Sequence, residues 1–141
     1  MRLDPSGEPG VVMVVTGDGD EHLDATALTR TLSTFESDID VVVIVGETRP
    51  PEIEPFTTVA RAGGIAVRGE PSVDAVKRIR EGLVIATLDR SRVVRPRLPL
   101  GASPTALAEG LTAVLSGGAP HRRVRIADLV ACFDPAAIAF V

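Results

Sequence analysis

The sequence V-V-V-I-V-G-E-T-R-P, residues 41 to 50, lies near the start of the stretch from Ile39 to Leu100 that decides the fold. Its first five residues form a continuous run of β-branched side chains, which predicts a strand buried on both faces. The runs from Val11 to Val15 and from Ile65 to Arg68 predict two further strands. With helices between them, the order β-α-β-α-β predicts parallel strands, because such crossovers are right-handed within one sheet.

Helices are predicted where apolar side chains recur at helical spacing: Leu23 to Phe35, Phe56 to Ala62, Pro104 to about Leu115, and Val124 to Phe133. The third helix has the clearest start, since Ser103 can cap it and Pro104 suits its first turn. The segment from Pro71 to Arg80 is compatible with a helix or with an extended arm, whereas Leu83 to Leu88 predicts a strand.

The remaining segments are less regular. The run from Arg92 to Leu100 alternates arginine with apolar residues and prolines, which predicts an extended and exposed segment. Residues 1–10 predict a flexible lead-in rich in proline and glycine, and the apolar tail from Ala136 to Val141 predicts a strand or a docking segment. We expect residues 11–141 to form a single domain. With 45% hydrophobic and only 3% aromatic residues, its core suits a buried parallel sheet flanked by helices.

The composition argues against several classes of function. A net charge of −4 with few aromatics does not suit a nucleic-acid surface, which needs a basic stripe with stacking rings. Cys132 is the only cysteine, so we expect no disulfide within the chain and a buried, inert thiol in the last helix. No apolar run approaches the ~20 residues of a membrane helix, and the first residues do not resemble a signal peptide. A cytoplasmic location is therefore expected.

Arg49 is the first candidate ligand-binding residue, because it follows the predicted strand from Val41 to Val45 and precedes Pro50. Ligands of open α/β sheets bind beyond the carboxyl ends of the strands, and a guanidinium there can hold a phosphate through two parallel hydrogen bonds. The alternative is an exposed ion pair with Glu47, worth at most ~1 kcal/mol. The residues alone leave both interpretations open.

The triplet Asp89-Arg90-Ser91 is the second candidate, at the end of the predicted strand from Leu83 to Leu88. The aspartate could orient Arg90 toward an anion. The alternative is an exposed turn, which the residues alone favour. Further arginines follow and predict an interaction face for an acidic partner surface: Arg92, Arg95, Arg97, Arg122, Arg123 and Arg125.

The acidic turn T-G-D-G-D-E-H-L-D, residues 16 to 24, is the third candidate. Asp18, Asp20, His22 and Asp24 could ligate a divalent metal through oxygen and imidazole. The alternative, which we favour, is a solvated turn whose aspartates cap the following helix.

Three motifs together carry a resemblance to a known family. The sequences D-V-V-V-I-V-G-E-T-R-P, S-V-D-A-V-K-R-I and V-I-A-T-L-D-R-S begin at Asp40, Ser72 and Val84. Their order and spacing resemble the H-D-A-A-R-P, T-D-T-I-K-R and D-R-S motifs of the 2-C-methyl-D-erythritol 4-phosphate cytidylyltransferases of isoprenoid biosynthesis. The resemblance covers roughly residues 11 to 115. It implies a three-layer, Rossmann-like nucleotidyltransferase fold with a mostly parallel sheet.

The resemblance also implies losses. Gly46 stands at the position of the family's metal-binding aspartate, and Ala75 at that of a threonine that holds substrate. Leu98 to Leu100 replace the T-P-Q motif, no lysine follows Lys77, and the loop that wraps CTP is missing from this sequence. Because nucleotidyl transfer depends on neutralising charge that develops on phosphates, we expect no catalytic residues here.

Arg49 and Arg90 match family positions, so the resemblance implies that both bind substrate. The region of residues 71–98 corresponds to an arm that crosses to a second subunit in the family, which implies a homodimer. We expect a non-catalytic dimeric scaffold, or a relative that binds a phosphorylated small molecule or CTP, with no cofactor. The alternative is a functional cytidylyltransferase, which would convert CTP and a sugar-alcohol phosphate to a CDP-alcohol and pyrophosphate and would use magnesium.

Overall fold

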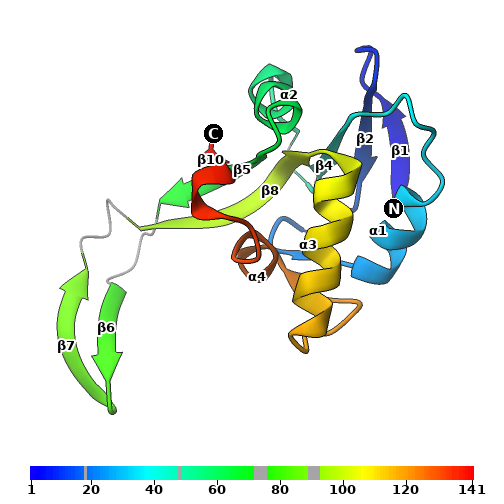
Figure 1. The fold of residues 1–141 in the computed structure, drawn as a ribbon. Coiled ribbons are helices and arrows are strands. Elements are labelled where there is room, and N and C mark those ends of the chain that lie inside the picture. Colours follow the sequence, from blue (N-terminus) through cyan, green and yellow to red (C-terminus); the bar gives the residue numbers. More distant parts are fainter. Residues whose placement is uncertain (18, 48, 72–75, 89–92) are drawn as a thin grey trace.

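The computed structural model describes residues 1–17, 19–47, 49–71, 76–88 and 93–141. Within these residues, six strands form one mixed sheet (Figure 1). Their order across the sheet is β1 (Arg2–Pro5), β2 (Val11–Val15), β4 (Val41–Val45), β8 (Val94–Ala102), β5 (Ile65–Pro71) and β10 (Ile138–Phe140).

Four of these strands run in the same direction. Strand β2 pairs in parallel with β4, and β10 pairs in parallel with β5. Strand β8 lies between β4 and β5 and is antiparallel to both, while β1 is antiparallel to β2. The predicted direction of the β-α-β-α-β strands is therefore confirmed, and β8 adds an antiparallel strand at the centre of the sheet.

The prediction that the run from Arg92 to Leu100 is exposed is wrong for its last part. Leu98 and Leu100 are fully buried, because β8 continues to Ala102 between two other strands. The alternating sequence predicts extended backbone correctly. Where an extended segment enters the core, however, depends on its pairing with distant strands.

Helices cover both faces of the sheet, so the domain has three layers (Figure 1). The helices α1 (Ala25–Leu32), α3 (Pro104–Ser116) and α4 (Ile126–Val130) pack on one face, and α2 (Glu54–Arg61) packs on the other. The larger core cluster joins the sheet to the first three helices through fully buried side chains such as Leu28, Ile44, Leu100, Leu107 and Leu129. The predicted three-layer, mostly parallel α/β fold is confirmed.

Local chemistry explains where the helices begin and end. Asp24 Oδ1 accepts a hydrogen bond from Ala27 N–H at 3.0 Å, and Ser103 Oγ accepts one from Ala106 N–H at 3.1 Å. Both are N-caps that satisfy a donor of the first turn. After α2, Gly63 adopts a φ of 89°, a left-handed conformation that closes a helix and that glycine adopts without strain.

A short two-stranded ribbon takes the place of the first residues of two predicted helices. Strand β3 (His22–Leu23) pairs antiparallel with β9 (Val124–Arg125), so α1 and α4 each begin after it. Helix α4 also ends early, at Val130. Cys132 therefore lies beyond the helix with an exposed side chain, which corrects the prediction of a buried thiol.

Segments near both ends of the chain pair with the sheet. Within the predicted lead-in, Arg2–Pro5 form the edge strand β1 instead of irregular backbone. Within the apolar tail, β10 confirms the strand interpretation, and Val141 N–H extends its pairing by donating to Val67 O at 3.0 Å. Among the described residues, no helix is long and apolar enough to cross a membrane.

An arm projects from the body beyond β5 and β8 (Figure 1). It is an antiparallel hairpin of β6 (Val76–Arg80) and β7 (Leu83–Leu88), which decides the ambiguity over residues 76–80 in favour of extended structure. The turn at its tip contains Glu81 and Gly82, both at positive φ. Three large apolar side chains near the tip are more than half exposed: Ile79, Leu83 and Val84.

Candidate functional site

The carboxyl ends of β2 and β4 lie side by side, and each is followed by a turn that carries polar groups. Thr16 N–H donates to Val45 O at 2.9 Å, which ties the first turn to the end of β4. The second turn begins with Gly46, which is packed closely against the first. Because ligands of open α/β sheets bind at this edge, it is the candidate site.

Asp20 stands at the centre of this edge. Its side chain is only 7% exposed, and its Oδ2 lies 3.0 Å from Nη2 of Arg68 on β5. Its Oδ1 accepts a hydrogen bond from Glu47 N–H at 2.9 Å, and its carbonyl accepts one from Leu98 N–H at 2.9 Å. A buried carboxylate is stable only with such partners. Asp20 therefore joins its own turn to β5, β8 and the turn after β4.

Gly46 leaves the space that Asp20 fills. A Cβ atom on Gly46 would lie 2.2 Å from Asp20 Oδ1 and 2.5 Å from Gly19 O, so a larger residue does not fit without a shift. In the family that the motifs resemble, this position holds the metal-binding aspartate. The carboxylate present here comes from another turn and is held by Glu47 N–H and Arg68. These residues do not fit a magnesium ion.

The other acidic groups of the turn are also placed for structural roles. Asp24 caps α1, as the favoured alternative predicted, and His22 lies in β3 opposite Arg125. The prediction of a solvated turn is wrong for Asp20, because its side chain is buried and binds Glu47 N–H and Arg68. Asp18 lies outside the described residues. In the part of the chain that the structure describes, no group of three or more His, Cys, Asp or Glu side chains is arranged to hold a metal.

Arg97 and Glu70 form a second ion pair at this edge, with Nη1 and Oε2 2.6 Å apart on neighbouring strands. The hydrogen bond from Arg97 lowers the pKa of Glu70 below its ordinary value of 4.5, and it also raises the pKa of Arg97. Arg95 and Glu21 extend this network through ion pairs of 3.7 to 3.9 Å. The Nε atoms of Arg68 and Arg97 are buried and find no acceptor among the described residues.

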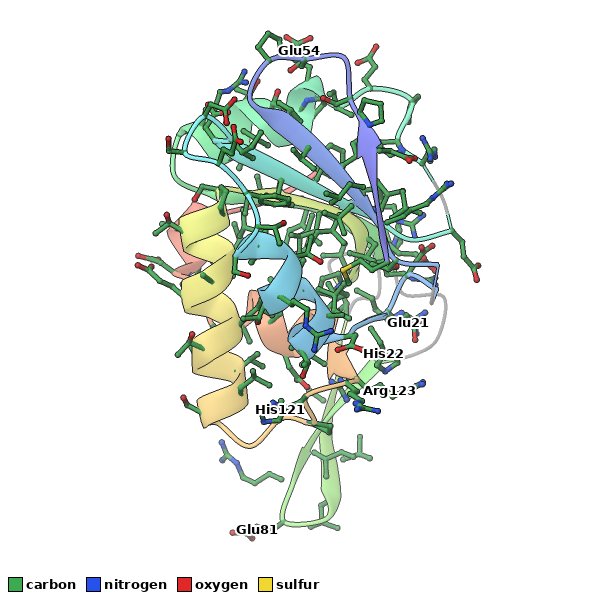
Figure 2. All side chains as sticks on the ribbon, turned by 90° about the vertical axis from the view of Figure 1, so that its right-hand side faces the viewer. Glu21, His22, Glu54, Glu81, His121 and Arg123 are labelled. Carbon is green, nitrogen blue, oxygen red and sulfur yellow. The ribbon has the colours of Figure 1, made fainter. Side chains whose placement is uncertain are left out.

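A groove of about 400 Å³ opens beside this network, between the start of β8 and the β3–β9 ribbon. Figure 2 shows Glu21 and His22 close together here, on the side of the body that also carries Arg123. The groove walls carry Arg95, Arg97 and Arg125, but each of these pairs with a carboxylate. The charge along the groove is therefore nearly balanced.

Arg49 forms an exposed ion pair, as the alternative interpretation proposed, but with a different partner. It pairs with Asp4 of β1, not with Glu47, and about half of its side chain is exposed. It lines a second cavity, of about 260 Å³, together with Arg68. Arg90 lies outside the described residues with its neighbours Asp89 and Ser91, so their site role and their distance from Arg49 remain predictions.

Sequence reasoning missed Arg68 and Glu70, which the structure places at the edge of the sheet. They stand two residues apart in one strand, so their side chains lie on the same face. Arg95 and Arg97 repeat this spacing in β8, and the register sets Arg68 opposite Arg97 and Glu70 opposite Arg95. The opposite charges of Glu70 and the two arginines of β8 could have suggested a contact, although no local pattern shows that the two segments are neighbours.

The fold defines a class, the three-layer α/β proteins with a mostly parallel sheet. Within this class, the chain is similar to 4-diphosphocytidyl-2C-methyl-D-erythritol synthase from Anaerococcus prevotii, with 17% identity and a TM-score of 0.59 over 80% of this chain and 52% of that one. It is also similar to 2-C-methyl-D-erythritol 4-phosphate cytidylyltransferase from Thermus thermophilus, with 18% identity and a TM-score of 0.55 over 81% and 56% of the two chains.

The chain thus spans about half the length of the solved structures it matches. No family model matches it, and no curated protein does. At this level of identity the similarity shows the fold, and this fold is the cytidylyltransferase-like one that the motifs predicted.

Proposed function

We propose that this chain is a cytidylyltransferase-like protein that does not catalyse nucleotidyl transfer. It acts in the cytoplasm as a dimeric scaffold or as a protein that binds a phosphorylated small molecule. The observation that carries this proposal is the contact between Asp20 and Gly46, because a carboxylate already held by Arg68 fills the space of the residue that would bind metal in the family.

The chemistry of the reaction supports the loss of activity. Charge that develops on the transferred phosphoryl group must be neutralised by a metal and by basic side chains. Losing one such group typically costs a factor of about 10² to 10³ in rate. Here the carboxylate at the metal position is held by protein groups, and Lys77 is the only lysine of the sequence. Arg49 and Arg90 remain as the proposed contacts for a phosphoryl group.

The arm supports a homodimer. A two-stranded hairpin is at best marginally stable by itself in water. This hairpin also exposes Ile79, Leu83 and Val84, which a second copy of the chain would bury. We therefore propose that the arm of each protomer packs against the other.

A functional cytidylyltransferase is the second candidate, favoured by the fold shared with two proteins of that name. It would act on CTP and 2-C-methyl-D-erythritol 4-phosphate. To act, it would need basic groups and a metal site at positions other than those of the family's motifs.

Pyrophosphate release from CTP and 2-C-methyl-D-erythritol 4-phosphate with magnesium separates the two candidates. We expect a rate equal to that of a reaction without protein, with an active cytidylyltransferase as the positive control. Release above this background that requires both substrates would contradict the non-catalytic proposal. Binding of either substrate without turnover would support the ligand-binding form of it.

A further inference from the structure

The cavity that Arg49 lines is mostly apolar and rich in proline. It measures about 260 Å³, and its apolar lining consists of Pro50, Pro51, Pro55, Phe56, Pro99 and Val141. Proline fixes its own φ angle, so the four prolines restrict the backbone of this wall. A preformed apolar cavity with a few polar groups is the usual form of a small-molecule site.

Two arginines, Arg49 and Arg68, line this cavity, and the guanidinium of each pairs with a carboxylate. Arg49 pairs with Asp4, and Arg68 pairs with Asp20 at 3.0 Å. A guanidinium has five N–H donors, so one carboxylate uses only part of them. The buried Nε of Arg68 also has no acceptor among the described residues. Glu52 is the acidic group on the rim, and it is exposed.

We propose that this cavity binds a small organic acid, whose anionic head contacts Arg49 and Arg68 and whose apolar body packs on Phe56 and the prolines. The inference rests on the proposed function, because that function makes Arg49 an anion-binding residue. A carboxylate and a phosphate monoester would both serve as the head, since each accepts forked hydrogen bonds from arginine.

Titration calorimetry of the full chain with four probes tests the chemistry of the ligand. Benzoate and phenyl phosphate carry both a head and an apolar body, inorganic phosphate lacks the body, and benzyl alcohol lacks the charge. We expect benzoate or phenyl phosphate to bind at least about tenfold more tightly than the other two probes, a difference of about 1.4 kcal/mol. Whichever of the two binds more tightly identifies the head group.

Two substitutions at the cavity test the position of the site. Arg49→Gln removes the proposed contact from an exposed ion pair and should weaken binding at least about tenfold. Arg61→Gln is the matched control, because Arg61 also forms an exposed ion pair, with Asp40 at 3.1 Å, but does not line the cavity. Arg68→Lys keeps a positive charge beside Asp20, so the variant should still fold. It removes the forked geometry of the guanidinium, so the variant should bind the probes more weakly than wild type.

The outcomes separate this inference from the proposed function. If inorganic phosphate binds as tightly as phenyl phosphate, the protein binds an anion, as the proposed function requires. The inference then fails, because the apolar cavity does not contribute to binding. If no probe binds, the inference fails, while the ligand-binding form of the proposed function is decided separately by binding of CTP or 2-C-methyl-D-erythritol 4-phosphate. Equal affinity in Arg49→Gln and Arg61→Gln, or tight binding of benzyl alcohol, would overturn the inference.

Discussion

The carboxylate of Asp20 occupies the volume that a side chain at residue 46 would need, so these two positions constrain each other. Gly46 is required for its small size, since its backbone is not in the left-handed region that favours glycine. Asp20 is required for its partners, because removing it would leave Arg68 without this carboxylate in a partly buried place.

Replacing Gly46 with alanine should therefore destabilise the fold. The new Cβ would meet a buried ion pair and the Gly19 carbonyl, which we expect to cost about 2–3 kcal/mol of unfolding free energy. Gly117→Ala is the control, since its Cβ would have its nearest neighbour at 3.4 Å and its φ is −77°. Urea titrations followed by circular dichroism measure both. Equal stability of the two variants would show that Asp20 moves aside without cost.

The ion pair between Glu70 and Arg97 predicts a dependence of stability on pH. The folded-state pKa of Glu70 lies below its ordinary value of 4.5, so its contribution is present above that value and is lost as pH falls through the folded pKa. Wild type should exceed Glu70→Gln in thermal midpoint at about pH 7, and this difference should shrink as the pH falls below 4.5. Glu109→Gln removes a carboxylate from an exposed position on α3 and serves as the control. A constant difference across this range would contradict the prediction.

Some of these residue roles could be predicted from the sequence and others could not. The caps Asp24 and Ser103 act on backbone three residues away, so local patterns reveal them. Asp20 and Arg68 are 48 residues apart, and their contact depends on which strands are neighbours. Arg49 could be placed at a strand end, but its partner Asp4 lies in a segment that the sequence predicts to be irregular.

Among the elements, the arm exposes apolar side chains that packing within a single chain does not cover. Its two strands pair with each other, and its tip presents apolar side chains where a free hairpin would carry polar ones. An exposed apolar hairpin of this kind favours contact with another surface.

Placing a charge at the tip should weaken the proposed dimer. Leu83→Lys would put an ammonium group where wild type exposes 70% of a leucine, so burial against a second copy would become unfavourable. Analytical ultracentrifugation should show a shift toward monomer, with an unchanged far-ultraviolet spectrum. Glu81→Lys, at the adjacent turn, introduces a lysine without removing an apolar group and should leave the dimer intact. A wild-type chain that is monomeric at high concentration would refute the arm's proposed role.

Element boundaries follow the same division between local and distant causes. Helices α2 and α3 could be placed from proline, glycine and cap residues. The ribbon of β3 and β9 shortens two predicted helices at their first residues. There, the backbone pairs with a segment far away in the sequence instead of forming the first turn of a helix. Cys132 was misplaced for a different reason, because the helix expected to bury it already ends at Val130.

On the scale of the whole molecule, the order and spacing of three short motifs predicted the fold. Buried β-branched runs specified the parallel strands, and the comparison with two solved cytidylyltransferases supports the same arrangement at 17% and 18% identity. The central position of β8 did not follow from those motifs. It arises because an extended segment with a hydrophobic end fills the gap between β4 and β5.

That central position has a mechanical consequence. Strand β8 begins at Val94, near the arm, and ends at Ala102 in the middle of the sheet, and β5 runs beside it for most of this length. A partner that pulled on the arm would pull first on these two strands. The same strands carry Arg68, Glu70 and Arg97, which form the Arg97–Glu70 and Arg68–Asp20 pairs. The arm and the charged sheet edge are thus connected through the same pair of strands.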